Sequence, residues 1–353
     1  MNASIDINAK EARLKILITG GNGFIGRRLL STLLERGKMV DADNQEREIE
    51  RIVISDIGPG LSPLPDDPRI EERIGPGQGD IGDLKVAANL AESRPDLVFH
   101  LAAVVSGEAE RDFDLGMRIN FHGSLQLLEA FRESGQTPRL VFAGSVAAYG
   151  GEMPKTIPDS AILTPQTSYG SQKAAIELML HDYSRRGFLD GRSLRLPTVV
   201  VRPGKANAAA SSFASAIIRE PLEGRPYTCP VSRETRVWLL SPRQAVKNLL
   251  HAASLPAGAF GMNRSLNLPG MTASVDEMID DLRAVAGSRI TDRLNFHIDP
   301  FIERIVSGWA TEFSPERALK LGFSPDPDFR SVIEAFIADD LGGQPPTSIG
   351  ANR

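Results

Sequence analysis

Tyr169 and Lys173 stand four residues apart in a stretch that reads SYGSQK over residues 168–173. On a helix, residues i and i+4 share a face, so a phenol and an ammonium group can converge on one point. A neighbouring cation favours the phenolate and lowers the pKa of the phenol, which makes a tyrosine usable as a general base near neutral pH. The spacing alone occurs by chance in many chains, so its meaning depends on the segments around it.

A serine upstream of this pair ends a short apolar run. Residues 140–145 read LVFAGS, which predicts a buried strand that ends at Ser145. A hydroxyl at the carboxyl end of a parallel strand faces the crevice where such sheets bind ligands. Ser145 could therefore hold the substrate oxygen whose proton Tyr169 exchanges. Asn120, in a helix expected over 108–134, could bind a backbone carbonyl or a water near Lys173, or could be a buried structural asparagine.

Three glycines near the N-terminus connect an expected strand to an expected helix. Residues 14–19 form an apolar run, and apolar side chains recur at helical spacing over 24–36. The glycines permit a tight turn, a close approach of the backbone to a pyrophosphate, and close packing of the helix on the sheet. The free N–H groups of the helix N-terminus then favour phosphates. The sequence therefore predicts a dinucleotide site lined by Gly20, Asn22, Gly23, Phe24, Ile25 and Gly26.

Two aspartates follow at positions where a dinucleotide could meet them. Asp56 ends an expected strand over 52–56, and a carboxylate there can bind ribose hydroxyls and repel a 2′-phosphate, which favours NAD over NADP. The charged segment 41–50, expected as a loop, accounts for the long distance from the glycines. Arg27 and Arg28, which follow Gly26, could bind a phosphate. Their position inside the expected helix instead favours a place on its solvent-exposed face. Asp80 could contact adenine or could cap a helix.

Strands alternate with helices along the first two thirds of the chain, which predicts an α/β fold with a parallel sheet covered on both faces. From Arg202 onward the pattern is irregular and predicts a smaller, loop-rich region that caps the carboxyl ends of the strands. We expect flexible tails over 1–12 and 342–353, and a cofactor domain over 13–204 to which 236–262 returns. The substrate region would then comprise 205–235 and 263–341. Further strands are expected over 69–74, 97–103 and 193–201, and helices over 83–93 and 168–186.

Composition excludes several classes of protein. The 353 residues carry a net charge of -5, which gives no basic footprint for nucleic acid. We see no apolar run near the roughly 18 residues of a membrane span, and residues 1–12 lack the apolar core of a signal peptide. Cys229 is the only cysteine, so no internal disulfide can form and a reducing cytoplasm is expected. The five histidines show no metal-ligand spacing, and no metal site is expected.

Taken together, these residues resemble the extended branch of the short-chain dehydrogenase/reductase superfamily. The resemblance rests on TGGNGFIG at 19–26, GDI at 79–81, HLAA at 100–103, Asn120, Ser145 and the Tyr169/Lys173 pair. It implies a Rossmann-type doubly wound sheet and a catalytic triad of Ser145, Tyr169 and Lys173. It also implies that further residues line the cofactor, namely Asp80 and Ile81 at the adenine, Leu101, Ala102 and Ala103 near the pyrophosphate and ribose, and Pro197, Thr198 and Val199 at the nicotinamide.

The chain departs from two large groups of this branch. Sugar-nucleotide dehydratases carry an acidic pair after the serine, where this chain has Val146 and Ala147, and epimerases carry an acidic pair in the segment that follows Arg236 here. Three segments, 104–110, 197–205 and 207–215, instead resemble the D-erythronate dehydrogenase subgroup. That resemblance implies NAD-dependent oxidation of the C2 hydroxyl of a four-carbon sugar acid.

A small hydroxy acid needs a cation for its carboxylate. Arg202 and Lys205 follow the last expected strand, and an arginine can bind a carboxylate with two hydrogen bonds. Arg202 could equally brace the turn that follows it. Ser106 could bind a substrate hydroxyl or cap a loop.

Two other functions stay open. An NDP-sugar epimerase would use the same triad, with Arg236 as the candidate for its diphosphate site. A non-enzymatic NAD-binding regulator is disfavoured, because such proteins commonly lose the tyrosine or the lysine. We expect a small-molecule substrate and, by analogy, a homodimer formed by the helices that carry Asn120 and Tyr169.

Overall fold

An eight-stranded sheet forms the centre of the computed structural model, which describes residues 13–204 and 210–343. Its strands lie in the order β12-β8-β6-β5-β1-β3-β2, and β4 pairs with β3. All pairs are parallel except β2 with β3. The bounds are β1 (Leu14–Thr19), β2 (Lys38–Val40), β3 (Glu46–Asp56), β4 (Ile70–Ile74), β5 (Leu97–His100), β6 (Arg139–Ser145), β8 (Asp190–Leu196) and β12 (Ser265–Asn267).

β1 is the central strand, and the chain extends the sheet from it in both directions. β3 pairs with one side of β1 and β5 with the other, so the strand order reverses between β1 and β5. In open parallel sheets, ligands bind outside the carboxyl ends of the strands at such a switch point. The fold therefore predicts a ligand crevice where Thr19 and His100 end their strands.

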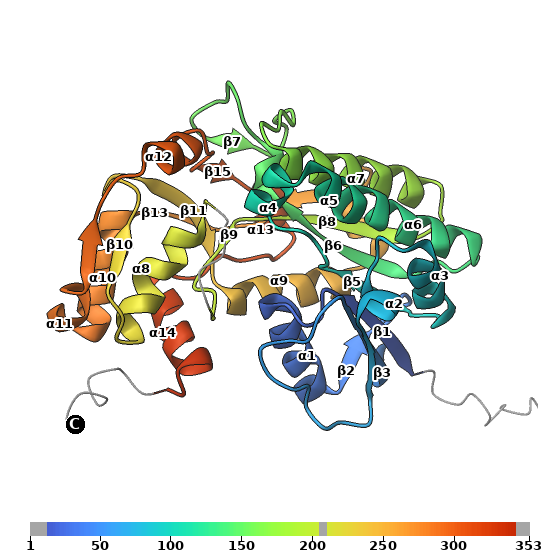
Figure 1. Cartoon of the computed structure of the whole chain (residues 1–353). Helices are drawn as coiled ribbons and strands as arrows, with labels where there is room; N and C mark the ends of the chain where they lie inside the picture. Colours follow the sequence, from blue (N-terminus) through green and yellow to red (C-terminus); the bar gives the residue numbers. More distant parts are fainter. Residues whose placement is uncertain (1–12, 205–209, 344–353) are drawn as a thin grey trace, which may run out of the picture.

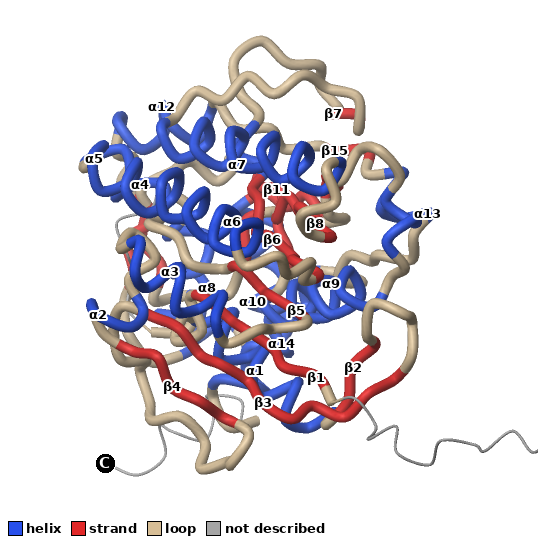
Figure 2. The backbone as a smooth tube through the Cα atoms, turned by 90° about the vertical axis from the view of Figure 1, so that its right-hand side faces the viewer, coloured by secondary structure: helices blue, strands red, loops and turns tan. Residues whose placement is uncertain are grey.

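Helices cover both faces of the sheet (Figures 1 and 2). Alternate residues of β1 point to opposite faces: Ile16 and Ile18 belong to a core with α1 (Phe24–Arg36) and α9 (Pro242–Ser254). Leu17 belongs to a second core, which contains side chains from α3 (Leu84–Glu92), α6 (Ser124–Glu133) and α7 (Ser168–Arg185). The predicted two-sided α/β sheet is confirmed.

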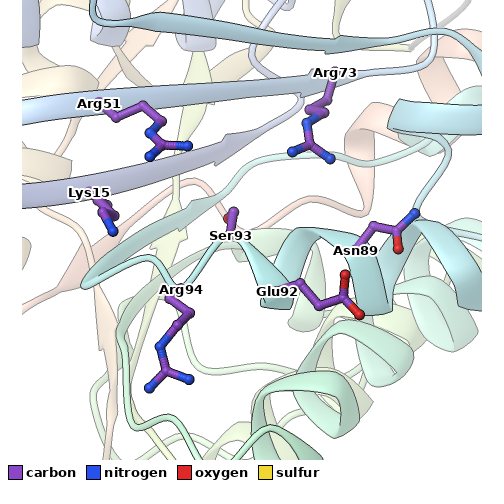
Figure 3. Close-up of a pocket in the computed structure, with 7 residues that line it drawn as sticks. All are labelled: Lys15, Arg51, Arg73, Asn89, Glu92, Ser93 and Arg94. Atoms are coloured by element: carbon purple, nitrogen blue, oxygen red, sulfur yellow. The ribbon is translucent and has the colours of Figure 1, made fainter.

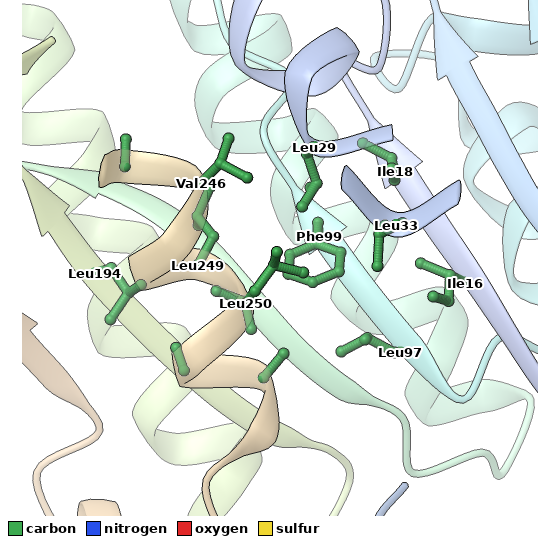
Figure 4. Close-up of a cluster of buried hydrophobic side chains, with 14 of the residues drawn as sticks. Ile16, Ile18, Leu29, Leu33, Leu97, Phe99, Leu194, Val246, Leu249 and Leu250 are labelled. Carbon is green, nitrogen blue, oxygen red and sulfur yellow. The ribbon is translucent and has the colours of Figure 1, made fainter. Parts of the chain in front are cut away.

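The helix α9 comes from late in the chain and packs beside α1. Figure 4 shows Val246, Leu249 and Leu250 of α9 facing the side chains of Phe99 and Leu194. The Ser241 hydroxyl caps α9 by accepting a hydrogen bond from Gln244 N at 3.0 Å. β12, which follows α9, adds an edge strand to the main sheet.

A smaller region with its own core lies beside the sheet, on the left in Figure 1. Three helices pack there, α8 (Ser212–Leu222), α10 (Val275–Ala286) and α14 (Phe329–Asp340). A three-stranded sheet joins them in the order β13 (Met271–Ser274), β11 (Arg236–Leu240) and β9 (Thr198–Val199). The short pair of β10 (Tyr227–Cys229) with β14 (Leu294–Phe296) also belongs to it, whereas the pair of β15 (Phe313–Ser314) with β7 (Ile157–Pro158) packs in a separate small cluster.

Short helices connect these parts. They are α2 (Pro76–Gly79), α4 (Ser106–Arg111), α5 (Phe113–Gly116), the π-helical η1 (Met117–Gly123), η2 (Val146–Ala148), η3 (Ala257–Phe260), α11 (Ser288–Thr291), α12 (Pro300–Ser307) and α13 (Glu316–Lys320). Among the residues described, no helix is long and apolar enough to cross a membrane.

Several predicted elements are wrong in their extent, and one of them, the strand expected over 97–103, ends at His100. The strand expected over 193–201 ends at Leu196, and β9 beyond Pro197 joins β11 in the other sheet, because proline cannot donate to a continuing ladder. Part of the loop expected over 41–50 belongs to the β2–β3 hairpin. The single helix expected over 108–134 is broken where Asp112 accepts a hydrogen bond from Leu115 N at 2.9 Å and starts α5.

The division of the chain into a cofactor domain and a substrate region stays a prediction. Residues 1–12, most of the C-terminal tail and Lys205 lie outside the described residues.

Candidate active site at the carboxyl ends of the strands

Gly20 forms the turn that leaves β1 and brings three segments together. Its φ of +70° lies in the left-handed region, which strains other residues. Its N–H donates to Ser55 O at 2.8 Å, and a Cβ atom here would lie 2.6 Å from Ala102 N. At Gly26 a Cβ atom would lie 2.5 Å from Gly20 O. Glycine is thus required at both positions, and the turn touches the segment 101–103.

The N-terminus of α1 is open to an anion. Its N-cap, Gly23, has no side chain, and the first turn carries no acidic residue. Asn22 is held beside it, because Asn22 N donates to Asp56 Oδ2 at 2.9 Å and Asn22 Nδ2 donates to Gly58 O at 2.8 Å. Asn22 Oδ1 is buried without a partner in the described part of the chain. These features fit the phosphates and ribose of a dinucleotide.

Asp56, at the end of β3, lies close to the segment that carries Asp80. A Cβ atom on Gly79 would lie 1.9 Å from Asp56 O, so the GDI segment is pressed against the end of β3. Asp80 accepts from Gly82 N at 2.9 Å and from Arg118 Nη1 at 2.8 Å. The alternative that Asp80 caps the following helix is wrong, because Asp83 is the N-cap of α3.

Arg27 and Arg28 do not form the solvated face that we expected. Arg27 Nη2 donates to Ser62 O. Arg28 pairs with Asp339 and Asp340 on α14. Both guanidinium groups are therefore engaged by other parts of the protein.

Tyr169 lies in the first turn of α7, against the loop that carries Ser145. Thr167 caps the helix by accepting from Gly170 N at 3.1 Å. A Cβ atom on Gly170 would lie 2.1 Å from Ala147 O, so the helix can approach this closely only with glycine. Ser145 Oγ accepts from Ala147 N at 3.1 Å, which fixes the serine beside the tyrosine.

The electrostatic environment of Tyr169 differs from the prediction. Burial raises the pKa of its phenol, while the Arg202 guanidinium and the Ser145 hydroxyl act in the opposite direction. The prediction that the ammonium of Lys173 lowers this pKa stays open; the Arg202 guanidinium, which the sequence analysis had not linked to Tyr169, acts in that direction. Arg202 is thus placed to influence the base.

Lys173 lies in a buried position behind the tyrosine. Its Nζ donates to Ala143 O at 3.0 Å. The same atom lies 4.6 Å from the centroid of the Phe142 ring and 5.7 Å from that of Tyr169. Burial lowers the pKa of Lys173 to about 7. Phe142, which the sequence analysis did not select, is therefore part of the lysine's site; its place on the buried strand β6 was the only available signal.

Asn120 sits in the π-helical segment η1 and binds a backbone carbonyl, one of the alternatives that we predicted. Its Oδ1 accepts from Val104 N at 2.8 Å, and its Nδ2 donates to Val104 O at 3.1 Å and to Gln172 Oε1 at 2.8 Å. It therefore joins the loop after β5 to the helix of Tyr169 and Lys173. Gln172 was missed, because one amide within a helix gives no signal in a sequence.

His100 was quoted only as part of a motif, yet it connects three elements. Its Nδ1 lies 2.6 Å from Thr19 Oγ1 and its Nε2 lies 2.9 Å from Ser124 Oγ. Burial, together with the charge of Lys173, lowers the pKa of His100 to about 3, so the ring is neutral. Leu101 N donates to Thr19 O at 3.0 Å, which aligns the segment 101–103 with the glycine turn.

Arg202 and the segment 197–199 lie on the other side of the crevice. Arg202 Nε donates to Val199 O at 3.0 Å and Arg202 Nη2 donates to Ser211 Oγ at 3.3 Å. The guanidinium carbon lies 5.8 Å from the centroid of the Phe24 ring, so this arginine also approaches the glycine turn. The second substrate candidate, Ser106, is half-buried at the first position of α4.

A dinucleotide turn at the switch point, with a serine, a tyrosine and a lysine beside it, defines an NAD-dependent oxidoreductase. A family model places the chain more narrowly. The chain belongs to the NAD dependent epimerase/dehydratase family, whose model matches residues 16–255.

Curated relatives match nearly the whole chain. A D-erythronate dehydrogenase from Cupriavidus necator is 48% identical over 326 residues, which cover 92% of this chain and 98% of the relative. A D-erythronate dehydrogenase from Haemophilus influenzae is 41% identical and covers 93% of this chain and 100% of its own.

Among solved structures, a nucleoside-diphosphate-sugar epimerase from Agrobacterium tumefaciens superposes with a TM-score of 0.88 at 41% identity. The match covers 97% of this chain and 99% of that one. The predicted family, fold, enzyme class and cofactor are confirmed.

Proposed function

We propose that this enzyme oxidises the C2 hydroxyl of D-erythronate to the 2-oxo acid with NAD. The observation that carries the proposal is the placement of Ser145, Tyr169 and the charge of Arg202 at one end of the parallel strands. An alcohol, a base and a carboxylate partner are the groups that oxidation of a hydroxy acid needs. The identity of 48% to a D-erythronate dehydrogenase supports this choice of substrate.

Tyr169 acts as the general base in this proposal. Its phenolate takes the proton of the C2 hydroxyl, and the Ser145 hydroxyl donates a hydrogen bond to the same oxygen. The charge of Arg202 favours the phenolate and opposes the effect of burial on the pKa of Tyr169. Arg202 thereby opposes, without reversing, the rise in the pKa of Tyr169 that burial causes.

NAD, when bound, accepts the hydride from C2 of the acid. Lys173 would hold the nicotinamide ribose. The hydrogen bond from Lys173 Nζ to Ala143 O keeps its amine near the tyrosine. Asn120 would keep the loop after β5 in register with α7. The residues that would hold the cofactor are Gly20, Asn22, Gly23, Phe24, Ile25, Gly26, Asp56, Asp80, Ile81, Leu101, Ala102, Ala103, Tyr169, Lys173, Pro197, Thr198 and Val199.

Arg202 would also bind the carboxylate of the acid. Its Nε and Nη2 are engaged by Val199 O and Ser211 Oγ, which fixes the orientation of the guanidinium. The remaining amino group lies on the same planar fork and can donate to an anion. Ser106, at the start of α4, would donate to a hydroxyl of the acid. Both roles explain why the substrate is a short polyhydroxy acid.

The test is NADH formation with purified enzyme, NAD and a panel of four-carbon sugar acids that includes D-erythronate and L-threonate. We expect turnover with D-erythronate, and turnover should collapse in Tyr169→Phe while NAD binding remains. Absence of NADH with every acid, although NAD binds, would overturn the proposal.

The second candidate is an NDP-sugar epimerase, because the solved structure at 41% identity is that of a nucleoside-diphosphate-sugar epimerase. Arg236, the candidate for a diphosphate site, is exposed at the start of β11. An epimerase would retain NAD through purification, bind a UDP-sugar and form no net NADH. A dehydrogenase would release its cofactor and accumulate NADH.

We also propose a homodimer formed through the helices near Asn120 and Tyr169. Leu178 on α7 and Phe113 on α5 are 61% and 58% exposed, which is unusual for side chains of this size. The helices α6 and α7 lie side by side on the outer face in Figure 2. Sedimentation equilibrium should show a dimer that Leu178→Glu dissociates; a monomeric wild-type enzyme would overturn this.

A further inference from the structure

A polar hollow lies on the sheet face that α3 covers, away from the glycine turn. It has a volume of about 550 Å³ and is lined by seven residues, Lys15, Arg51, Arg73, Asn89, Glu92, Ser93 and Arg94. Four of these are cations and one is an acid. Figure 3 shows Arg51 and Arg73 extending from β3 and β4 toward α3, with Lys15 beside Arg51.

Strand register explains why these cations share one face. Lys15 pairs with Arg51 across β1 and β3, and Ser55 pairs with Arg73 across β3 and β4. Since alternate residues of a strand point to the same face, Arg51 and Ser55 lie on one side of β3, and their partners lie there too. The sheet itself therefore fixes Lys15, Arg51 and Arg73 as one group.

The four cations of the hollow outnumber the carboxylates around them by one, because Glu92 lines the hollow, Glu71 adjoins it and Asp96 Oδ2 accepts from Lys15 N at 2.8 Å. Glu71 is shared by Arg51 at 2.8 Å and by Arg73 Nε at 2.7 Å, so one carboxylate serves two guanidinium groups. Neither Lys15 nor Arg94 has an ion-pair partner in the part of the chain that the structure describes. The result is a concave surface with an excess of positive charge and free N–H donors.

We propose that this hollow, lined by Lys15, Arg51, Arg73 and Arg94, binds a small anion that carries a diphosphate group. Arginine binds phosphate oxygens with paired hydrogen bonds, and a lysine adds a point charge. Cations on the three strands β1, β3 and β4 and just beyond the end of α3 suit a ligand with charge at more than one place. A single phosphate would reach fewer of them and bind more weakly.

The site is separate from the cofactor crevice but shares its strands. Lys15 lies near the start of β1, whereas Gly20 follows the end of the same strand. Arg51 lies on β3, which ends at Asp56. A diphosphate bound here would be held by residues that no step of the oxidation uses, so the inference does not depend on the proposed function.

The experiment is calorimetric titration of the NAD-saturated enzyme with inorganic pyrophosphate at low ionic strength, with inorganic phosphate and ADP titrated separately. Saturation with NAD keeps these anions out of the cofactor crevice. We expect one pyrophosphate per chain, with affinity at least about tenfold higher than for phosphate and lower at high salt. Equal affinities for ADP and pyrophosphate would identify the diphosphate alone as the ligand, and tighter binding of ADP would add a contact to its nucleoside.

Substitutions inside and outside the hollow test whether the anion binds there. Lys15→Gln and Arg94→Gln should each weaken pyrophosphate binding by about tenfold, the effect of losing one charge-assisted hydrogen bond. Arg94 is exposed, so its substitution leaves the fold intact. The matched control is Arg132→Gln on α6, whose guanidinium pairs with Glu129 outside the hollow; binding should not change. No binding to the NAD-saturated enzyme, or equal binding by all these variants, would overturn the proposal.

Discussion

The strands of the main sheet begin along its amino-end edge and finish along its carboxyl-end edge. These two edges serve different purposes. At the amino ends of β6 and β8, Asp190 accepts hydrogen bonds from Arg139 at 3.2 Å and from Arg192 at 2.6 Å, and it pairs with Arg264. At the carboxyl ends, Ser145 ends β6 and Tyr169 lies beside it in the first turn of α7. One edge surrounds a carboxylate with cations, and the other keeps its reactive groups available.

The charges at the amino-end edge are compensated by structure. Arg139 Nη1 donates to Ala253 O at 2.6 Å and Arg192 donates to Ala252 O, so both arginines meet the C-terminus of α9. The partial negative charge of a helix C-terminus favours cations there. At the other edge, the positive N-terminus of α1 has no side-chain cap and is left for a ligand. The comparison indicates that charge stabilises the fold at one edge and serves binding and catalysis at the other.

The largest effect should follow substitution of the base. Tyr169→Phe removes only the phenol oxygen and should lower kcat by at least about a thousandfold, because the general base is lost. Thermal stability and NAD binding should stay near those of the wild type. Tyr183→Phe, on the same helix but in the apolar core, is the matched control and should retain turnover. Initial rates of NADH formation measure both.

The next effect belongs to the amino-end edge and should appear in stability alone. Asp190→Asn leaves Arg139, Arg192 and Arg264 without their carboxylate and should lower the free energy of unfolding by about 3 kcal/mol. Urea denaturation measures this, with the exposed Asp182→Asn as control. A large loss of kcat at full folding would contradict the separation of the two edges.

The same carboxylate should give an acid-dependent contribution to stability. Burial opposes ionisation of Asp190, but Arg192, Arg264 and Arg139 together hold its pKa below the ordinary 3.8. A depressed folded-state pKa means that the stabilisation is present above the unfolded value and is lost as pH falls below it. The difference between wild type and Asp190→Asn should therefore shrink in acid.

A smaller effect is expected at Arg202, which acts on both the base and the acid. Arg202→Gln should raise the kinetic pKa of the base, since a nearby cation favours the phenolate. It should also raise KM for the sugar acid by about tenfold or more. Arg202→Lys, which keeps the charge, should preserve the kinetic pKa better than KM. The pH profile of kcat/KM separates these results.

The last effect concerns the buried amine of Lys173. Its pKa is lowered by burial from 10.5 to about 7. Below about 7, folded and unfolded chains both bind the proton, and the cost of burying the charge is fully present. Above it the folded chain releases the proton first, so stability relative to Lys173→Met should increase with pH, by up to about 1.4 kcal/mol per unit. Urea unfolding of both chains near pH 7 and pH 9 tests this, and a constant difference would refute it.

Sequence patterns predicted the parts of the fold that depend on local periodicity. The strand over 14–19, the helix over 24–36 and its end at Gly37 follow from apolar spacing and a C-terminal glycine. The transfer of β9 to another sheet did not follow, because pairing with β11 is set by tertiary contacts rather than by residue type. For the same reason, the sequence predicted only that the segment 236–262, which contains α9, returns to the cofactor domain.

For the candidate site, as for the fold, the sequence predicted some features and missed others. Motifs located Ser145, Tyr169 and the glycine turn, since each needs a particular residue at a particular position. They did not reveal that the charge of Arg202 opposes the effect of burial on the pKa of Tyr169, or that Phe142 lies beside the lysine. Those relations join residues distant in sequence and appear only when the strands and helices are assembled.

The most direct test of the account is NADH formation from D-erythronate by the wild type, with L-threonate and a UDP-sugar as competing substrates. The account predicts net NADH with D-erythronate, little with L-threonate, and no effect of the UDP-sugar. NAD retained by the purified enzyme, no NADH from any acid, and epimerisation of the UDP-sugar would contradict it.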